Sequence, residues 1–119
     1  MNNKRLGTEF EREVCKLLKR EGFWVHFLNP NASGAQPFDI IAIRNGRAVA
    51  IDCKTSAQHV FPISRLEDNQ VFAFEKWAEC GNGDSFVLVK FGGRIYAISY
   101  RFLKKYGKAD MWNMEPWEV

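Results

Sequence analysis

The sequence has few cysteines and no long apolar run. Its three cysteines, Cys15, Cys53 and Cys80, are odd in number, widely spaced and outside any C-x-x-C pair or zinc-ligand spacing. This pattern argues against a disulfide framework or a zinc site and favours reduced, mostly buried thiols. No window approaches the roughly 18 apolar residues of a membrane span, and the first ten residues lack an apolar signal segment. We therefore expect a cytoplasmic or nucleoid-associated protein without a membrane partner.

The excess of positive charge is also small. The chain has 17 Lys and Arg against 14 Asp and Glu, a net charge of +3, which is compatible with nucleic-acid binding without arguing for it. With 119 residues, of which 46% are hydrophobic and 14% aromatic, the chain is long enough for one domain with a core and too short for two. We therefore expect a single domain over residues 1–119.

Capping patterns predict the helices. Thr8 as N-cap and Glu11 at the third helical position, with apolar residues at helical spacing after them, predict a helix from about Glu9 to Glu21. A second capping box, Ser64-Arg65-Leu66-Glu67, predicts another helix that ends near Gly81. A short basic helix is expected at 101–106.

Runs rich in β-forming residues predict the strands. The Asn-Gly pair at 45–46 and the Gly-Gly pair at 92–93 each lie between two such runs, which is typical of β-hairpins. The expected strands cover residues 23–28, 38–43, 48–55, 85–91 and 94–100. The resulting order, αβββαββ, indicates an α/β fold with a mixed five-stranded sheet flanked by helices.

Two charges interrupt the apolar stretch AVAIDCKT. Residues i and i+2 of a strand point to the same side, so Asp52 and Lys54 share a face, about 6.6 Å apart along the chain. The predicted hairpin can also bring Asp39 beside Asp52. Two close carboxylates repel each other unless a positive charge lies between them. Oxygen ligands favour Mg²⁺ or Mn²⁺, held by Asp39, Asp52 and the backbone carbonyl of Cys53.

Lys54 would then position or deprotonate a water, or stabilise a phosphorane-like transition state. The alternative is a plain ion pair between Asp52 and Lys54 on a solvated strand face, with Asp39 as a turn residue. The 12 residues between Asp39 and Asp52 favour the metal site but leave both interpretations open.

The order of these residues resembles a known nuclease signature. Pro37-Phe38-Asp39 followed by Asp52-Cys53-Lys54 is similar to the PD-(D/E)XK motif, with the proline one place further from the aspartate than the motif's name implies. The surrounding residues resemble RecU-type Holliday junction resolvases and archaeal Hjc resolvases over roughly residues 4 to 100. The matching segments are Gly7 to Glu11, Glu11-Arg12-Glu13, Gly22 to Val25, Asn45-Gly46-Arg47, Phe61-Pro62-Ile63 and Gln70.

The resemblance implies a restriction-endonuclease-like fold and a Mg²⁺-dependent, structure-specific DNA endonuclease, most simply a Holliday junction resolvase of recombination and repair. Carried over by position, Asp39 and Asp52 would be metal ligands, Lys54 the catalytic lysine, Glu11 a further acid reaching the metal, and Gln70 a polar helper. Two of these residues have structural alternatives. Glu11 is also explained as a capping acid, and Gln70 as a core amide.

The sequence departs from the RecU type in three places. Asn69 stands where that type has histidine, which affects none of the roles assigned above. Asp52 stands where that type usually has glutamate, which shortens the reach to a metal. The long stalk that engages the junction centre is missing, because only ten residues separate Leu28 from Asp39. Selectivity for junctions is therefore a weaker expectation than nuclease chemistry. A restriction-like or repair nuclease acting on other DNA, and a catalytically dead DNA-binding module of the same fold, remain alternatives.

DNA is the expected partner, and the candidate phosphate contacts are Lys4, Arg5, Ser33, Gln36 and Arg65. A four-way junction has two symmetric cleavage points, so a resolvase is expected to be a homodimer. The tail carries four large apolar residues that would either form part of the dimer interface or cover the core. They are Met111, Trp112, Met114 and Trp117.

Overall fold

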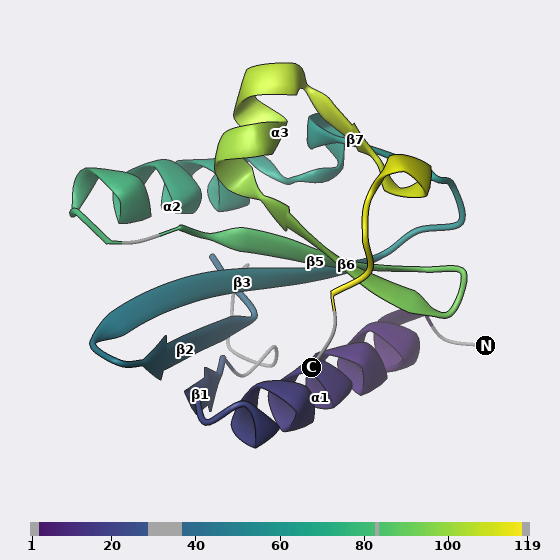
Figure 1. Cartoon of the computed structure of the whole chain (residues 1–119). Helices are drawn as coiled ribbons and strands as arrows, with labels where there is room; N and C mark the ends of the chain where they lie inside the picture. The colour runs from purple at the N-terminus through teal and green to yellow at the C-terminus, as the bar shows by residue number, and fades with distance from the viewer. Residues whose placement is uncertain (1–2, 29–36, 83, 118–119) are drawn as a thin grey trace.

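A five-stranded sheet with helices on both faces forms the centre of the computed structural model, which describes residues 3–28, 37–82 and 84–117 (Figure 1). The helix α1 lies on one face, and α2 and α3 lie on the other. The elements are α1 (Asn3–Arg20), β1 (Trp24–Phe27), β2 (Ile40–Arg44), β3 (Arg47–Thr55), β4 (Val60–Pro62), η1 (Ile63–Arg65), α2 (Asp68–Glu79), β5 (Phe86–Phe91), β6 (Arg94–Ser99), α3 (Tyr100–Tyr106), β7 (Lys108–Asp110) and η2 (Met111–Asn113). Among the described residues, no helix has the length and apolar character needed to cross a bilayer.

The order of strands in the main sheet is β1-β2-β3-β5-β6, with β3 and β5 parallel and the other neighbours antiparallel. The predicted mixed five-stranded sheet is confirmed. Asn45 and Gly46 both have positive φ, 54° and 74°, as the predicted tight hairpin between β2 and β3 requires. A second, two-stranded sheet of β4 and β7 was not predicted, because strands of three residues carry no readable alternation.

The predicted start of the first helix is wrong. The helix α1 begins at Asn3, so Thr8 lies inside it and is not its N-cap. Lys4, Arg5 and Leu6 are good helix formers, which lets the helix continue upstream of the capping pattern. The predicted end is confirmed, because Gly22 adopts φ +89° directly after the last turn.

The second capping box was also misplaced. Pro62 is followed by the short helix η1, and Leu66 has an extended backbone, so α2 begins at Asp68. Its N-cap is Glu67, and the capping box pairs Glu67 with Gln70. The side chain of Gln70 therefore takes part in starting this helix.

The two faces of the sheet carry separate cores. Phe10, Val14 and Leu18 of α1 pack on one face, and Phe74 of α2 and Leu103 of α3 pack on the other. Successive residues of β3 alternate between them, since Ala50 belongs to the α2 and α3 side and Ile51 to the α1 side. Asp52 therefore points to the same side as Ala50, towards α2.

Most of the C-terminal tail covers these cores. Met111 is buried, Met114 packs against the core beneath α2 and α3, and Trp117 packs on the α1 side. Trp112 differs, because 70% of it is exposed. The three cysteines are free, but Cys15 and Cys53 are only partly buried and Cys80 is exposed, so the prediction of mostly buried thiols holds in part for the first two and fails for Cys80. Cys80 follows the last turn of α2, where the chain turns away from the core.

Candidate active site

Asp39 lies where β2 is about to begin, opposite Asp52 of β3. The first pair of the β2–β3 ladder is Ile40 with Ile51, so the preceding position faces Asp52. The N–H of Asp39 donates to the carbonyl of Ile51 at 3.0 Å, and its Oδ2 accepts from the N–H of Cys53 at 2.7 Å. The side chain of Asp39 thus continues the ladder of hydrogen bonds beyond the end of β2.

The carbonyl of Cys53 points to the same edge as its N–H, because both polar groups of one strand residue lie on the same side of the strand. That edge is the one at which Asp39 lies. The end of β3 therefore presents a carbonyl oxygen beside the Asp39 carboxylate.

Asp52 is a buried carboxylate, only 1% exposed. Its Oδ1 accepts a hydrogen bond of 2.8 Å from Nε2 of Gln70, and its Oδ2 lies 3.4 Å from Nζ of Lys54. No hydrogen-bond partner reaches Oδ2 in the described part of the chain. Burial, and then the negative charge of Asp39, raise the pKa of Asp52 to about 8, although Lys54 acts in the opposite direction.

Gln70 connects this carboxylate to the start of α2. Its Oε1 accepts from the N–H of Glu67 at 3.0 Å while its Nε2 donates to Asp52. Both ends of the amide are hydrogen-bonded, which fixes the orientation of the side chain. The sequence left open whether Gln70 is a core amide or a site residue, and the structure gives it contacts of both kinds.

Glu11 approaches Asp39 and Lys54 from α1. Burial and the charge of Asp39 raise the pKa of Glu11 to about 7, and Lys54 again acts in the opposite direction. The pKa of the Cys53 thiol is raised as well, first by burial and then by Asp39, Asp52 and Glu11. Asp39 thus lies close enough to both Glu11 and Asp52 for their charges to interact. A group with a pKa near 7 can hold or release a proton at neutral pH.

The donor set fits a hard divalent cation that keeps part of its water shell. No three His, Cys, Asp or Glu side chains within the described ranges already form a cage for a metal ion. Mg²⁺ does not need one, because one or two carboxylates, a carbonyl and waters suffice. Oδ2 of Asp52 supports the same conclusion, because it accepts no hydrogen bond among the described residues and only the Lys54 ammonium, 3.4 Å away, offsets the cost of burying its charge.

The structure describes the side chain of only one of the five predicted DNA-binding residues. Arg65 donates from Nη2 to the carbonyl of Thr55 at 3.0 Å, so its guanidinium lies one residue beyond Lys54 at the end of β3. Lys4 and Arg5 belong to the first turns of α1, but their side chains are outside the described residues, and so are Ser33 and Gln36.

The sequence analysis did not single out Lys90. It lies on β5 opposite Thr55, and its Nζ is 2.8 Å from Oε1 of Glu13. The signal was available, because Lys90 is the only charged residue in the apolar strand Phe86–Phe91.

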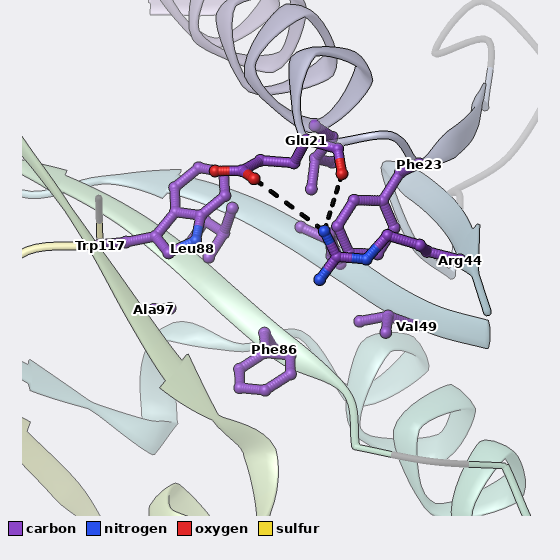
Figure 2. Close-up of a pocket in the computed structure, with 10 residues that line it drawn as sticks. Glu21, Phe23, Arg44, Val49, Phe86, Leu88, Ala97 and Trp117 are labelled. Atoms are coloured by element: carbon purple, nitrogen blue, oxygen red, sulfur yellow. Dashed lines mark hydrogen bonds and ion pairs between the residues drawn. The ribbon is translucent and has the colours of Figure 1, made fainter. Parts of the chain in front are cut away.

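A mostly apolar cavity of about 360 Å³ lies elsewhere, and none of Glu11, Asp39, Asp52 and Lys54 lines it (Figure 2). Phe86 and Trp117 form part of its wall. At one side Nη1 of Arg44 donates to the carbonyl of Glu21 at 2.7 Å. The apolar cavity and the acid cluster are therefore separate features of the molecule.

Comparisons with known proteins agree on one family. Residues 2–112 match the family model of archaeal Holliday junction resolvase (Hjc). Over 104 residues, the chain is 33% identical to the crossover junction endodeoxyribonuclease Hjc of Methanocaldococcus jannaschii, covering 87% of this chain and 73% of that protein. The fold is similar to that of Archaeoglobus fulgidus Hjc, a Holliday junction resolvase, with a TM-score of 0.67, 20% identity, and coverage of 86% of this chain and 85% of that one.

Proposed function

Because the chain belongs to the family of archaeal Holliday junction resolvases, we propose that it is a metal-dependent endonuclease that cuts phosphodiester bonds at four-way DNA junctions. One observation carries the chemistry. Among the described residues, no hydrogen-bond donor reaches the buried Oδ2 of Asp52, which lies 3.4 Å from Nζ of Lys54, beside Asp39. A site that leaves a buried carboxylate oxygen without a hydrogen-bond donor is suited to a cation and a phosphate.

Mg²⁺ or Mn²⁺ is the proposed cofactor, with Asp39, Asp52 and the carbonyl of Cys53 as ligands and Glu11 as a further acid near it. Such a cation, when bound, supplies positive charge that offsets the negative charge developing on the phosphate during hydrolysis.

The remaining residues act on protons and on position. The Lys54 ammonium orients the attacking water and stabilises negative charge on the phosphate oxygens. Gln70 holds Asp52 in place through its 2.8 Å hydrogen bond, so it is a positioning residue. Glu11, whose pKa is raised to about 7, can exchange a proton at neutral pH.

Contacts to the DNA backbone are assigned to Lys4, Arg5, Ser33, Gln36 and Arg65. Among these, Arg65 is supported by its hydrogen bond to Thr55, which keeps its guanidinium beside the site. We propose a homodimer, because two symmetric cuts require two sites. Its substrate would be cellular DNA in the cytoplasm or nucleoid, and residues 1–119 would act as one nuclease domain.

The direct test compares cutting of a four-way junction with cutting of a linear duplex of the same sequence, with and without Mg²⁺ or Mn²⁺. The proposal predicts metal-dependent cutting of the junction, lost in Asp52→Asn while binding is kept. Glu79→Gln is the matched control, because Glu79 is an exposed acid that pairs with Lys76 at 3.2 Å.

Three other outcomes would contradict the proposal. Equal cutting of both DNAs would indicate a nuclease without junction selectivity. Metal-independent binding without cutting would indicate a DNA-binding module. If sedimentation equilibrium shows one protein chain in the DNA complex, the proposed homodimer is wrong.

A further inference from the structure

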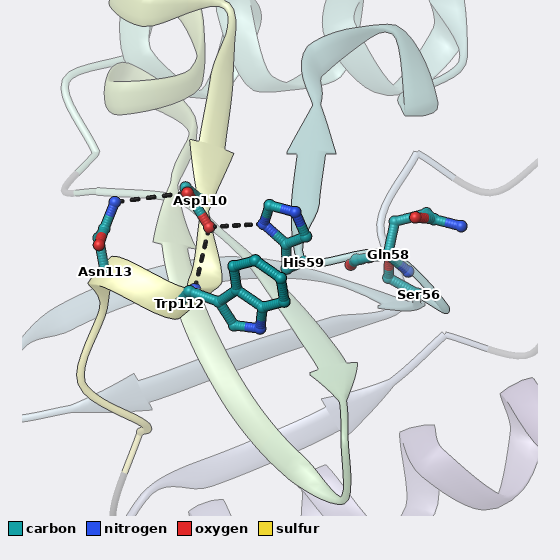
Figure 3. A network of polar contacts seen from close by, with 6 residues as sticks. All are labelled: Ser56, Gln58, His59, Asp110, Trp112 and Asn113. Carbon is teal, nitrogen blue, oxygen red and sulfur yellow. Dashed lines mark hydrogen bonds and ion pairs between the residues drawn. The ribbon is translucent and has the colours of Figure 1, made fainter.

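An exposed tryptophan lies on a stack with a histidine near the end of the small sheet (Figure 3). The rings of Trp112 and His59 are parallel, with centroids 3.5 Å apart and an interplanar angle of 0°. Although 70% of Trp112 is exposed, the residue before it, Met111, is only 1% exposed. The indole is therefore presented to solvent from a segment that is anchored in the core.

One carboxylate holds the ring of His59 and the backbone of Trp112. Oδ1 of Asp110 lies 2.9 Å from Nδ1 of His59 and accepts the backbone N–H of Trp112 at 3.1 Å. A further hydrogen bond of 2.7 Å runs from the N–H of Met111 to the carbonyl of His59. Because these bonds hold the imidazole and the backbone that carries the indole before any ligand arrives, a ligand that stacks on the indole costs the protein less additional entropy.

The same segment is tied to the proposed active site. His59 follows Lys54 by five residues, so their Cα atoms are at most about 18 Å apart. Ser56 lies between them, with its N–H bonded to the carbonyl of Lys90 at 2.9 Å and its hydroxyl to the carbonyl of Gln58 at 2.7 Å. The position of the stack relative to Lys54 is thus fixed by hydrogen bonds along the connecting loop.

We propose that Trp112, supported by His59, is a stacking platform for a nucleobase at the branch point of the DNA. This inference rests on the proposed function and names a residue that would select branched over linear DNA. In a linear duplex both faces of each base pair are covered by neighbours. At a branch point stacking is interrupted, and one face of a base is available.

A nucleobase fits this surface better than a protein side chain does. In the described part of the chain, His59 is the only ring that stacks on Trp112, so the outer face of the indole is open to a second flat group. Stacking on an aromatic side chain tolerates every base, because each has a π-face. This agrees with a nuclease that recognises branching and not sequence.

The experiment measures the dissociation constants of a four-way junction and of the matching linear duplex in EDTA, where no cutting occurs. The variants are Trp112→Ala, Trp112→Phe and, as matched control, Trp24→Ala. Trp24 is 59% exposed and stacks on His26 at 6.0 Å. It pairs with Ile43, at the end of β2 away from Asp39.

We expect Trp112→Ala to raise the dissociation constant of the junction by about 5- to 150-fold, the range found when a base-stacking residue is removed, and to leave that of the duplex unchanged. Trp112→Phe should keep most of the affinity, and Trp24→Ala should match the unchanged protein. A 2-aminopurine at the branch point should be quenched on binding to the unchanged protein and less quenched with Trp112→Ala.

Equal affinities of Trp112→Ala and the unchanged protein for the junction would overturn the proposed stacking role of Trp112. Equal losses of affinity for the junction and the duplex would overturn it as well. If Trp112→Ala does not fold, as judged by circular dichroism, His59→Ala replaces it, and no loss of junction affinity there overturns the proposal as well. The proposed function fails separately, when the unchanged protein with Mg²⁺ does not cut the junction.

Discussion

The side chain of Gln70 connects Asp52 of β3 to the start of α2. Its Nε2 lies 2.8 Å from Oδ1 of Asp52, and its Oε1 lies 3.0 Å from the backbone nitrogen of Glu67. One amide therefore caps α2 and donates a hydrogen bond to one of the two oxygens of a buried carboxylate. The stability of the helix start and the orientation of a proposed metal ligand depend on the same residue.

Replacing Gln70 by alanine should affect both the stability of the protein and the orientation of Asp52. It leaves Oδ1 of Asp52 without a donor, which should lower the free energy of unfolding by about 1–3 kcal/mol. Loss of an orienting partner should lower metal affinity or activity by about 10- to 100-fold. Urea unfolding and a Mg²⁺ titration of junction cutting measure the two effects. Gln58→Ala is the control, because Gln58 is exposed and its hydrogen bonds to the Ser56 hydroxyl use only its backbone. Unchanged metal dependence in Gln70→Ala would limit the residue to a structural role.

The sequence predicted the sheet well for a physical reason. The hairpin at Asn45 and Gly46 and the alternation of β3 are local signals, and they were enough to bring Asp39 opposite Asp52. The register of a two-residue hairpin fixes every pair along its strands. The proximity of these two acids therefore follows from a turn that only a few residue types allow.

The parts that the sequence did not predict depend on contacts between distant segments. The start of α2 was misplaced because Glu67 and Gln70 form its capping box, and the Gln70 amide in that box is also held by Asp52, 18 residues away. The strands β4 and β7 pair Phe61 with Ala109, and neither strand carries its own signal. The stack of Trp112 on His59 likewise joins segments that only the folded chain brings together.

Stability without metal should fall as the pH rises from 5 to 8. The pKa of Asp52 is raised from 3.8 to about 8 in the folded protein, and that of Glu11 from 4.5 to about 7. Between these values the folded state keeps protons that the unfolded state has lost, so raising the pH favours unfolding. Above pH 8 both states are ionised and the dependence on these two groups ends. Thermal melting in EDTA at pH 5 and pH 8 measures the difference.

Mg²⁺ and the Asp52→Asn variant test whether Asp52 causes this pH dependence. Mg²⁺ should raise the melting temperature more at pH 8 than at pH 5, because it competes with protons for the carboxylates. Asp52→Asn should weaken the pH dependence and the effect of Mg²⁺ together, because asparagine does not titrate. A variant that keeps the full slope would show that Asp52 is not its source.

Two substitutions of Lys54 should separate its proposed roles. Lys54→Met removes the ammonium that lies 3.4 Å from Asp52 Oδ2, so cutting should fall strongly, and the pKa of Asp52 should rise further because Lys54 lowers it. Lys54→Arg keeps a positive charge that does not lose its proton at any working pH. Partial cutting by Lys54→Arg would indicate that charge is what the site needs. Loss as complete as in Lys54→Met would indicate proton transfer by the lysine. Single-turnover rates at saturating Mg²⁺ measure both.

The small sheet should contribute to stability through Phe61. This residue of β4 is fully buried and packs in the core beneath α2 and α3, while the Arg65 guanidinium lies over its ring with the centroid 5.3 Å away. Phe61→Ala should lower the free energy of unfolding by about 3–5 kcal/mol, because the cavity it leaves cannot fully collapse. Phe72→Ala is the matched control, since Phe72 is 64% exposed and should cost less than about 1 kcal/mol. Urea unfolding with equal m-values makes the two directly comparable. Equal, small losses would mean that β4 and β7 add little to the stability of the core, and Arg65 would then lack a rigid support beside Lys54.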